Sequence, residues 1–268
     1  MESLIFIKLG GSVITDKNTP FTSKNTAIRK LGREILKVQE KFKGKVIVAH
    51  GSGSFGHTVA AKYQTHKGII NKKSIEGFVK TSDAATEINK IVMKNLIDVG
   101  LKVKSFSPAS FIVAKNQKAQ KVFADPIRQC LLTGSVPVIY GDVVMDADIG
   151  FCIFSAEKVI EALVKALNKS YKVEKIIYCT DTDGVYNEHG KTIPLITPKN
   201  YRFVKKQITG SKSMDVTGGM IHKVEESLKL AKRFKVKVHL INGFLDNNIY
   251  NLISKKKINE TIILRNQK

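Results

Sequence analysis

The chain has 268 residues, of which 43% are hydrophobic and 25% are charged, as in ordinary globular proteins. This composition excludes a disordered chain and a small disulfide-stapled scaffold. A chain of this length buries roughly 70–75% of the surface that its unfolded form exposes, so it needs neither disulfides nor a structural metal to hold a core. Lysine and arginine number 45 against 23 for aspartate and glutamate, so the formal net charge is +22.

The strong positive charge attracts anionic partners. The basic residues are dispersed, with 255–257 as the longest run, and neither an RNP1-like pattern nor zinc-finger spacing accompanies them. We therefore expect a small phosphate-bearing substrate as the partner, and we do not expect nucleic acid.

The cysteines and the apolar runs bear on the compartment. Cys130, Cys152 and Cys179 are odd in number and form no CxxC pair, which argues against a disulfide framework and a zinc site. The apolar runs fall well short of the ~18–20 residues that span a bilayer. Residues 1–8 lack the basic region and cleavage site of a secretory signal. We expect a cytoplasmic protein with no membrane segment.

Strand-like and helix-like patterns alternate along the chain. In chain order they predict strand 4–9, helix 27–42, strand 45–49, helix 74–99, strand 136–140, a hairpin of 143–145 and 151–154, helix 155–167, strand 175–179, helix 217–234, strand 236–241 and strand 261–264. Gly100 is expected just after the helix 74–99, where glycine commonly ends helices. The alternation predicts one α/β domain with a mostly parallel sheet, helices on both faces and two lobes that meet near residue 170.

The glycine-rich segment 50–57, His-Gly-Ser-Gly-Ser-Phe-Gly-His, directly follows a predicted strand. Its glycines let the backbone approach an anion and expose N–H groups to it, and a helix that begins there would add its positive end. The segment matches the dinucleotide pattern GxGxxG, and it nearly matches a Walker A motif, with His57 in the lysine position. The expected second strand with its acidic end is missing, and a structural turn remains open as an alternative.

Three other loops carry glycine or acidic residues at the ends of predicted elements. They are 8–12, with Lys17 just beyond it, 180–185, and 215–220, which precedes a helix that carries Lys223. Ligands of open α/β sheets bind at the carboxyl ends of the strands. The loops therefore predict a glycine-lined anion site with lysines for the phosphates.

These three segments together resemble the amino acid kinase superfamily. Segments 50–57 and 213–220 resemble, within it, the archaeal-type isopentenyl phosphate kinase family. The resemblance covers essentially the whole chain in the right order, and its motifs are specific jointly rather than singly. It implies a three-layer αβα sandwich as a single domain over 1–268, with an acceptor-binding N-lobe at about 1–170 and a nucleotide-binding C-lobe at about 171–268.

The same resemblance implies ATP-dependent phosphorylation of isopentenyl phosphate to isopentenyl diphosphate in isoprenoid biosynthesis, with Mg²⁺, in a cytoplasmic homodimer. Lys8 and Lys17 would bracket the transferring phosphoryl group, with Lys17 stabilising the transition state. His57 would donate a hydrogen bond to the acceptor phosphate. The other implied acceptor contacts are Ser52, Phe78, Met145, Phe154, Ala156 and Glu157. The implied nucleotide contacts are Lys8, Gly10, Gly11, Ser12, Gly53, Asp181, Asp183, Gly219 and Lys223.

Several of these residues have a purely structural interpretation as well. Asp181 and Asp183 suit a tight turn, and the apolar residues suit an ordinary core. The chain also departs from the family where Ser155-Ala156-Glu157 replaces the common Ser-Gly-Asp. Alanine adds a Cβ near the acceptor phosphate, and glutamate lengthens the carboxylate that would organise the lysines.

The departure motivates an alternative, a kinase of the same fold that acts on another small phosphate or phosphonate acceptor, such as a fosfomycin-type antibiotic. Two further hypotheses come from other classes. If the GxGxxG pattern is a dinucleotide-binding motif, it predicts an oxidoreductase that uses a nicotinamide dinucleotide. The +22 charge predicts a non-enzymatic nucleic-acid binder whose affinity depends steeply on salt.

Overall fold

The computed structural model describes residues 1–209 and 219–266. Its strands are β1 (Glu2–Leu9), β2 (Lys45–His50), β3 (Val103–Phe106), β4 (Ile112–Lys115), β5 (Lys118–Val122), β6 (Val136–Tyr140), β7 (Asp142–Asp146), β8 (Gly150–Phe154), β9 (Tyr171–Thr180), β10 (Leu195–Ile196), β11 (Lys237–Asn242) and β12 (Glu260–Ile263). Its helices are α1 (Gly11–Ile14), α2 (Asn25–Lys41), α3 (Gly53–Tyr63), α4 (Ser74–Asp98), α5 (Asp125–Leu132), α6 (Ala156–Leu167), α7 (Tyr201–Thr209), α8 (Gly219–Phe234) and α9 (Asn248–Ile253), with short 3-10 turns η1 (Thr65–Lys67) and η2 (Pro108–Ser110).

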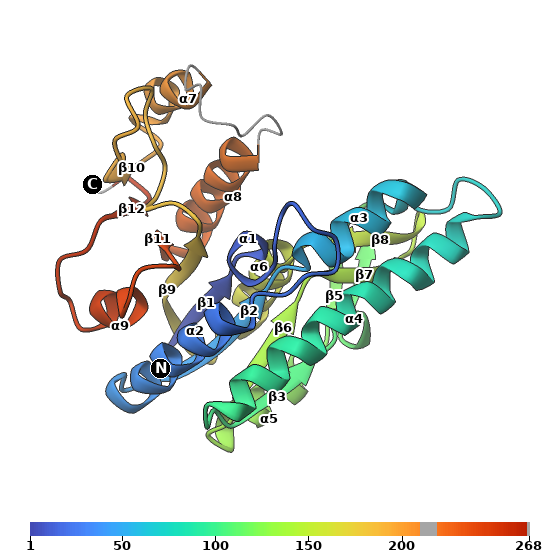
Figure 1. Ribbon diagram of the computed structural model, residues 1–268, viewed down its shortest axis with the longest axis horizontal. Coiled ribbons are helices and arrows are strands. Elements are labelled where there is room, and N and C mark those ends of the chain that lie inside the picture. The colour runs from blue at the N-terminus through green and yellow to red at the C-terminus, as the bar shows by residue number, and fades with distance from the viewer. Residues whose placement is uncertain (210–218, 267–268) are drawn as a thin grey trace.

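The main sheet has eight strands in the order β10-β12-β11-β9-β1-β2-β6-β3. All neighbours pair in parallel except β11 and β12. The central pair, β1 and β9, joins the strands before residue 170 to those after it (Figure 1). Because parallel strands end at the same edge, the loops after β1, β2, β6, β9 and β11 meet there.

Apolar side chains fill both faces of this sheet. One core cluster packs the sheet against α1, α2, α4 and α9, and the other packs it against α5, α6 and α8. The face of α2 illustrates the cause, because Ile28, Leu31, Ile35 and Val38 recur at spacings of three and four and are at most 1% exposed. The result is a sheet layer between two helix layers, and it confirms the predicted three-layer α/β fold.

A second sheet of four strands, in the order β5-β4-β7-β8, lies beside the main one. Strands β7 and β8 form the predicted antiparallel hairpin. Asp146 ties its turn together by accepting hydrogen bonds from the backbone N–H groups of Asp148 and Ile149. Across residues 1–209 and 219–266, no helix is both long and apolar enough to cross a membrane.

The predicted elements are confirmed within a few residues at each end. Ser155 caps α6 by accepting a hydrogen bond from the N–H of Lys158 at 3.3 Å, and Gly100 follows α4 with φ +95°. The predicted start of the helix at 217 and the motif residues 213–218 lie outside the described residues.

The sequence did not predict β3, β4, β5, β10, α1, α5, α7 or α9, and of α3 it suggested only a start near the glycine-rich segment 50–57. Most of these elements are short, and β10 has only two residues. A periodic pattern needs more residues than that to stand out, and β5 alternates poorly because three of its five residues are exposed and none is fully buried.

Candidate active site

Two glycine loops pack backbone to backbone at the edge of the sheet where the strands end. A Cβ on Gly11, after β1, would lie 2.8 Å from the Cα of Gly53, after β2. Gly53 has φ +50°, and a Cβ there would collide with Thr15. The Thr15 hydroxyl donates to Gly11 O (2.7 Å) and accepts from the N–H of Ser54 (3.1 Å). These glycines therefore hold the two loops in contact as well as leaving room for a ligand.

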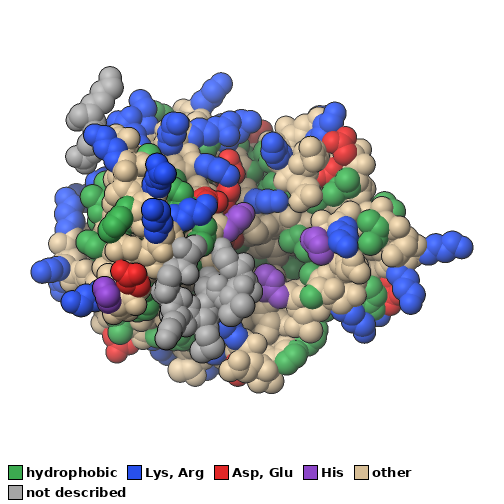
Figure 2. Space-filling model, turned by 90° about the horizontal axis from the view of Figure 1, so that it is seen from above, with side chains coloured by type: hydrophobic (Ala, Val, Ile, Leu, Met, Phe, Trp, Pro, Cys, Tyr) green, Lys and Arg blue, Asp and Glu red, His purple; other side chains and the backbone are tan. Residues whose placement is uncertain are grey.

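Two adjoining cavities open over these loops, on the face that Figure 2 shows hollowed near its middle. The larger, of about 960 Å³, lies between the ends of β1 and β9 and the start of α8. The smaller, of about 210 Å³, lies between α3, α4, β8 and α6. Both cavities are lined by Lys8, Gly11, Gly53, His57 and Glu157. Groups bound in the two cavities would therefore meet at these five residues.

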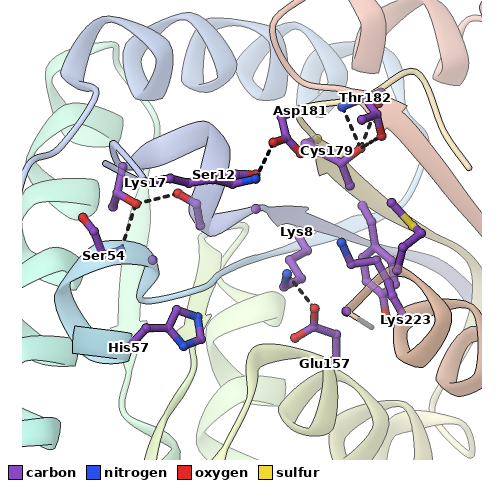
Figure 3. Close-up of a pocket in the computed structure, with 18 of the residues that line it drawn as sticks. Lys8, Ser12, Lys17, Ser54, His57, Glu157, Cys179, Asp181, Thr182 and Lys223 are labelled. Carbon is purple, nitrogen blue, oxygen red and sulfur yellow. Dashed lines mark hydrogen bonds and ion pairs between the residues drawn. The ribbon is translucent and has the colours of Figure 1, made fainter. Parts of the chain in front are cut away.

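Lys8 and Glu157 form an ion pair where the cavities join, with Nζ and Oε1 2.8 Å apart (Figure 3). The Lys8 side chain is only 8% exposed. Burial alone would raise the pKa of Glu157, but Lys8 and Lys223 lower it to about 2. Glu157 is therefore ionised throughout the physiological range and keeps Lys8 fixed at the junction.

A second ion pair joins Lys17 to Asp181 at 2.7 Å, with side chains 64% and 38% exposed. Burial acts to raise the pKa of Asp181, but the neighbouring Lys17 and Ser12 bring it below the ordinary value. Figure 3 places this pair on the opposite side of Lys8 from Glu157. The predicted catalytic residues Lys8, Lys17 and His57 thus line one cavity.

Most of the predicted nucleotide contacts lie together in the larger cavity. Its lining includes Lys8, Gly10, Gly11, Ser12, Gly53, Asp181, Gly219 and Lys223. Asp183 points elsewhere, because it accepts hydrogen bonds from Asn242 (2.9 Å) and Asn259 (3.1 Å) and holds the turn. This arrangement favours the turn interpretation for Asp183.

The predicted acceptor contacts divide into two groups. Ser52, His57, Phe154, Ala156 and Glu157 line the smaller cavity. Phe78 and Met145 are absent from the described residues that line either cavity. Phe78 stacks on Phe151 with ring centroids 5.1 Å apart, and Met145 is 52% exposed. A role of these two residues in binding an acceptor tail stays a prediction.

The structure adds residues to the site that the sequence analysis did not single out. Thr15, Ser54 and Tyr178 line the larger cavity, and Thr81 and Asp142 line the smaller. Burial raises the pKa of Asp142 to about 6, although hydrogen bonds from Val143, Ser82 and Ser107 act to lower it. Asp142 directly follows Gly141 at the end of a predicted strand, and that position was the available signal.

His50 has a structural role. It is fully buried, with ring nitrogens 3.0 Å from Gly51 O and 3.1 Å from Asn89 Oδ1. Its ring also stacks on that of Tyr140 at 5.4 Å. A histidine engaged on both nitrogens is not available to a ligand, as its position inside a strand end suggested.

The described residues contain no group of three or more His, Cys, Asp and Glu side chains able to hold a metal ion. The carboxylates of the larger cavity are Glu157 and Asp181, and each faces a lysine. A lining with two carboxylates, each beside a lysine, suits an anionic ligand that binds together with a cation. Mg²⁺ is commonly held by one or two carboxylates together with substrate phosphates.

A model described as the amino acid kinase family matches residues 3–242. The chain belongs to this family. Isopentenyl phosphate kinase of Methanocaldococcus jannaschii is 33% identical over 256 residues, which cover 92% of this chain and 94% of that protein. Isopentenyl phosphate kinase of Methanothermobacter thermautotrophicus is 32% identical over 97% of this chain and 98% of that one.

Solved structures agree with the assignment to the amino acid kinase family. One described as X-ray structures of isopentenyl phosphate kinase matches with a TM-score of 0.79 and 28% identity, covering 97% of this chain and 99% of that chain. The comparisons confirm the resemblance inferred from the sequence motifs, the fold and the assignment to kinases.

Proposed function

We propose that this protein transfers the γ-phosphoryl group of ATP to isopentenyl phosphate and forms isopentenyl diphosphate, a step of isoprenoid biosynthesis. The observation that carries the proposal is the meeting of two cavities at Lys8, His57 and Glu157. The larger has room and lysines for a nucleotide, and the smaller suits a short acceptor. The names of the relatives that are 32–33% identical support the same acceptor.

In this reaction an oxygen of the acceptor phosphate attacks the γ-phosphorus of ATP. The bond from that phosphorus to the β,γ-bridging oxygen breaks, and ADP leaves. Because the acceptor is already an anion, catalysis consists of positioning and charge neutralisation. Lys8 would lie between the two phosphates at the junction, Lys17 and Lys223 would neutralise charge from the nucleotide side, and His57 would donate a hydrogen bond to the acceptor phosphate.

We propose that ATP is used together with Mg²⁺, which neutralises charge on the phosphates when bound. Glu157 and Asp181 are the carboxylates that could contact it or its water ligands. We also assign the acceptor to an N-lobe at about 1–170 and the nucleotide to a C-lobe at about 171–268. In support, the described residues that line the smaller cavity all lie at or before position 157, and those that line the larger also include residues between 178 and 223.

We further propose a homodimer in the cytoplasm. Strand β3 ends the main sheet, and Ile97 on α4 and Leu132 on α5 nearby are 56% and 61% exposed. Edge strands beside apolar side chains favour pairing with another chain. Light scattering would report the mass, and Ile97→Glu should shift it toward the monomer. The three free cysteines fit a reducing compartment.

The direct test is ADP release from Mg·ATP with and without isopentenyl phosphate. We expect acceptor-dependent turnover. His57→Ala should raise the KM for isopentenyl phosphate about tenfold and leave the KM for ATP nearly unchanged, because one hydrogen bond to a charged group is lost. His66→Ala is the matched control, since His66 is exposed and outside both cavity linings. An unchanged KM in His57→Ala would contradict the acceptor assignment.

One observation favours the alternative of another small phosphate or phosphonate acceptor, such as a fosfomycin-type antibiotic. Thr81 and Asp142 bring polar groups to the cavity that would hold the apolar tail, and Ala156 occupies its wall at 2% exposure. A panel of phosphates and phosphonates at equal concentration distinguishes the two. A preference of tenfold or more in kcat/KM for another acceptor would replace isopentenyl phosphate and keep the reaction type.

A further inference from the structure

Tyr178 lines the larger cavity, and its hydroxyl is buried without a hydrogen-bond partner among the described residues. The whole residue is only 2% exposed. Buried polar groups almost always have partners, and an exception at a functional site needs a physical explanation. In the described chain the Ser54 hydroxyl, which lines the same cavity, is another such group. The other two, His239 Nε2 and Ser254 Oγ, lie outside both cavities, so Tyr178 and Ser54 are the unmatched groups of the described chain that belong to residues where a ligand would bind.

Tyr178 is the neighbour of Lys8 across the central strand pair. The two residues are register partners in β9 and β1, and the Lys8 Nζ lies 5.7 Å from the centre of the Tyr178 ring. An ammonium within about 6 Å of an aromatic face is attracted by the ring electrons. The ring therefore supports Lys8 from the sheet side while Glu157 holds it by the ion pair.

Three carboxylates act on the Tyr178 phenol electrostatically. Burial raises the pKa of Tyr178 well above its ordinary value, and Glu157, Glu161 and Glu226 raise it further, Glu157 most among them. The phenol therefore keeps its proton and can only be useful to a carboxylate as a hydrogen-bond donor. In the structure Glu157 is paired with Lys8, with Oε1 and Nζ 2.8 Å apart. A phosphate in the cavity would compete for the same ammonium.

We propose that Tyr178 is a positioning residue for phosphoryl transfer, whose ring supports Lys8 and whose hydroxyl donates to Glu157 when a phosphate draws Lys8 away. This inference rests on the proposed phosphoryl transfer but not on the identity of the acceptor. The exchange keeps Glu157 hydrogen-bonded while Lys8 turns to the transferring group. It explains why an unmatched hydroxyl is retained beneath the ion pair.

The test uses Tyr178→Phe, which keeps the ring, with Tyr171→Phe as the matched control. Tyr171 opens the same strand at its far end, is 4% exposed, and lies outside both cavities. Tyr178→Phe should melt no lower than the wild type, because it removes an unpaired group. Its kcat/KM for ATP should fall about tenfold, because the variant lacks the hydrogen bond that forms when the phosphates bind and that persists at the transition state. A kcat/KM for ATP within twofold of the wild type would overturn the proposal.

A second measurement needs no turnover. The sequence has no tryptophan and seven tyrosines, so tyrosine dominates the near-ultraviolet spectrum. Titration with tripolyphosphate, which does not absorb there, should give a red-shifted tyrosine difference band in the wild type and in Tyr171→Phe, but not in Tyr178→Phe. No band in the wild type, or the same band in Tyr178→Phe, would overturn the inference. Wild-type protein that gives the band but ignores isopentenyl phosphate would overturn only the proposed acceptor.

Discussion

The ammonium of Lys17 and the carboxylate of Asp181, 164 residues apart in the chain, lie 2.7 Å from each other beside the larger cavity. Lys17 follows the loop after β1, and Asp181 directly follows β9. The pair therefore links the loops of the two central strands on the side where the nucleotide phosphates would enter. With Lys17 64% exposed, it holds a mobile side chain in place more than it stabilises the fold.

Asp181→Asn should release Lys17. We expect a change in unfolding free energy below about 1 kcal/mol, because exposed ion pairs contribute little, but a fall in kcat/KM for ATP of about tenfold, because Lys17 is no longer oriented. Steady-state kinetics and denaturant unfolding measure both. Asp246→Asn is the control, since Asp246 also pairs with a lysine at 2.7 Å and lies outside the cavities. Equal kinetic effects in the two variants would refute the role of Asp181.

Glu157→Gln should damage both stability and turnover. Lys8 would stay buried without its counter-charge, at a cost of about 3 kcal/mol. The folded pKa of Glu157, about 2, lies below its ordinary value of 4.5, so its stabilising contribution is present above about pH 4.5 and is lost as the pH falls toward 2. Urea unfolding at several pH values should therefore show a gap between wild type and variant that closes in acid. A pH-independent gap would argue against the ion pair as its cause.

Asp142→Asn should stabilise the protein at neutral pH. The folded pKa of Asp142, about 6, lies above its ordinary value of 3.8, so the contribution of this group is most favourable below pH 3.8 and is lost as the pH rises through about 6. Above that pH the wild type holds a buried charge, and we expect the variant to be more stable by about 1–2 kcal/mol. Thermal unfolding from about pH 4 to 8 measures the difference. Asp125→Asn, at an exposed ion pair, should lack this pH dependence.

Gly53→Ala should disrupt the site. The new methyl group would meet Thr15 and the oxygen of Gly11, in a backbone conformation with φ +50°. We expect a loss of about 2–4 kcal/mol and of most activity, because overpacking and strain act together. Gly190→Ala separates the two causes, since Gly190 has φ +71° but nothing within 4 Å of a Cβ, and should lose only about 1 kcal/mol. Comparable losses in both variants would show that strain alone matters.

The sequence was sufficient to predict the sheet and the meeting of the glycine loops at one edge of it, for identifiable reasons. Strands such as 136–140 are buried on both faces and therefore read as continuous apolar runs. The glycine loops follow these strands directly, and parallel strands end together. The resemblance to the amino acid kinase superfamily added the expected roles of Lys8, Lys17 and His57, each of which lies within a few residues of such a loop.

The directions in which side chains point could not be predicted from the sequence. Phe78 and Phe151 are 73 positions apart, and only the packing of α4 on β8 brings their rings together. Met145 alternates outward on its strand although its neighbours Val143 and Val144 are buried. Tyr178 lies within an apolar run that indicates a strand, and nothing in that run reveals that its hydroxyl is buried without a hydrogen-bond partner among the described residues.

The contact between Gly11 and Gly53 involves no side chain. A mutation therefore has almost no side-chain atoms there that it could change. Evolution of a new acceptor preference would have to leave these loops untouched and act on the walls of the smaller cavity. Thr81 and Ala85 on α4 and Ile153 on β8 are such wall residues. Variation among descendants of this protein should therefore concentrate there, with the phosphate-handling machinery inherited unchanged.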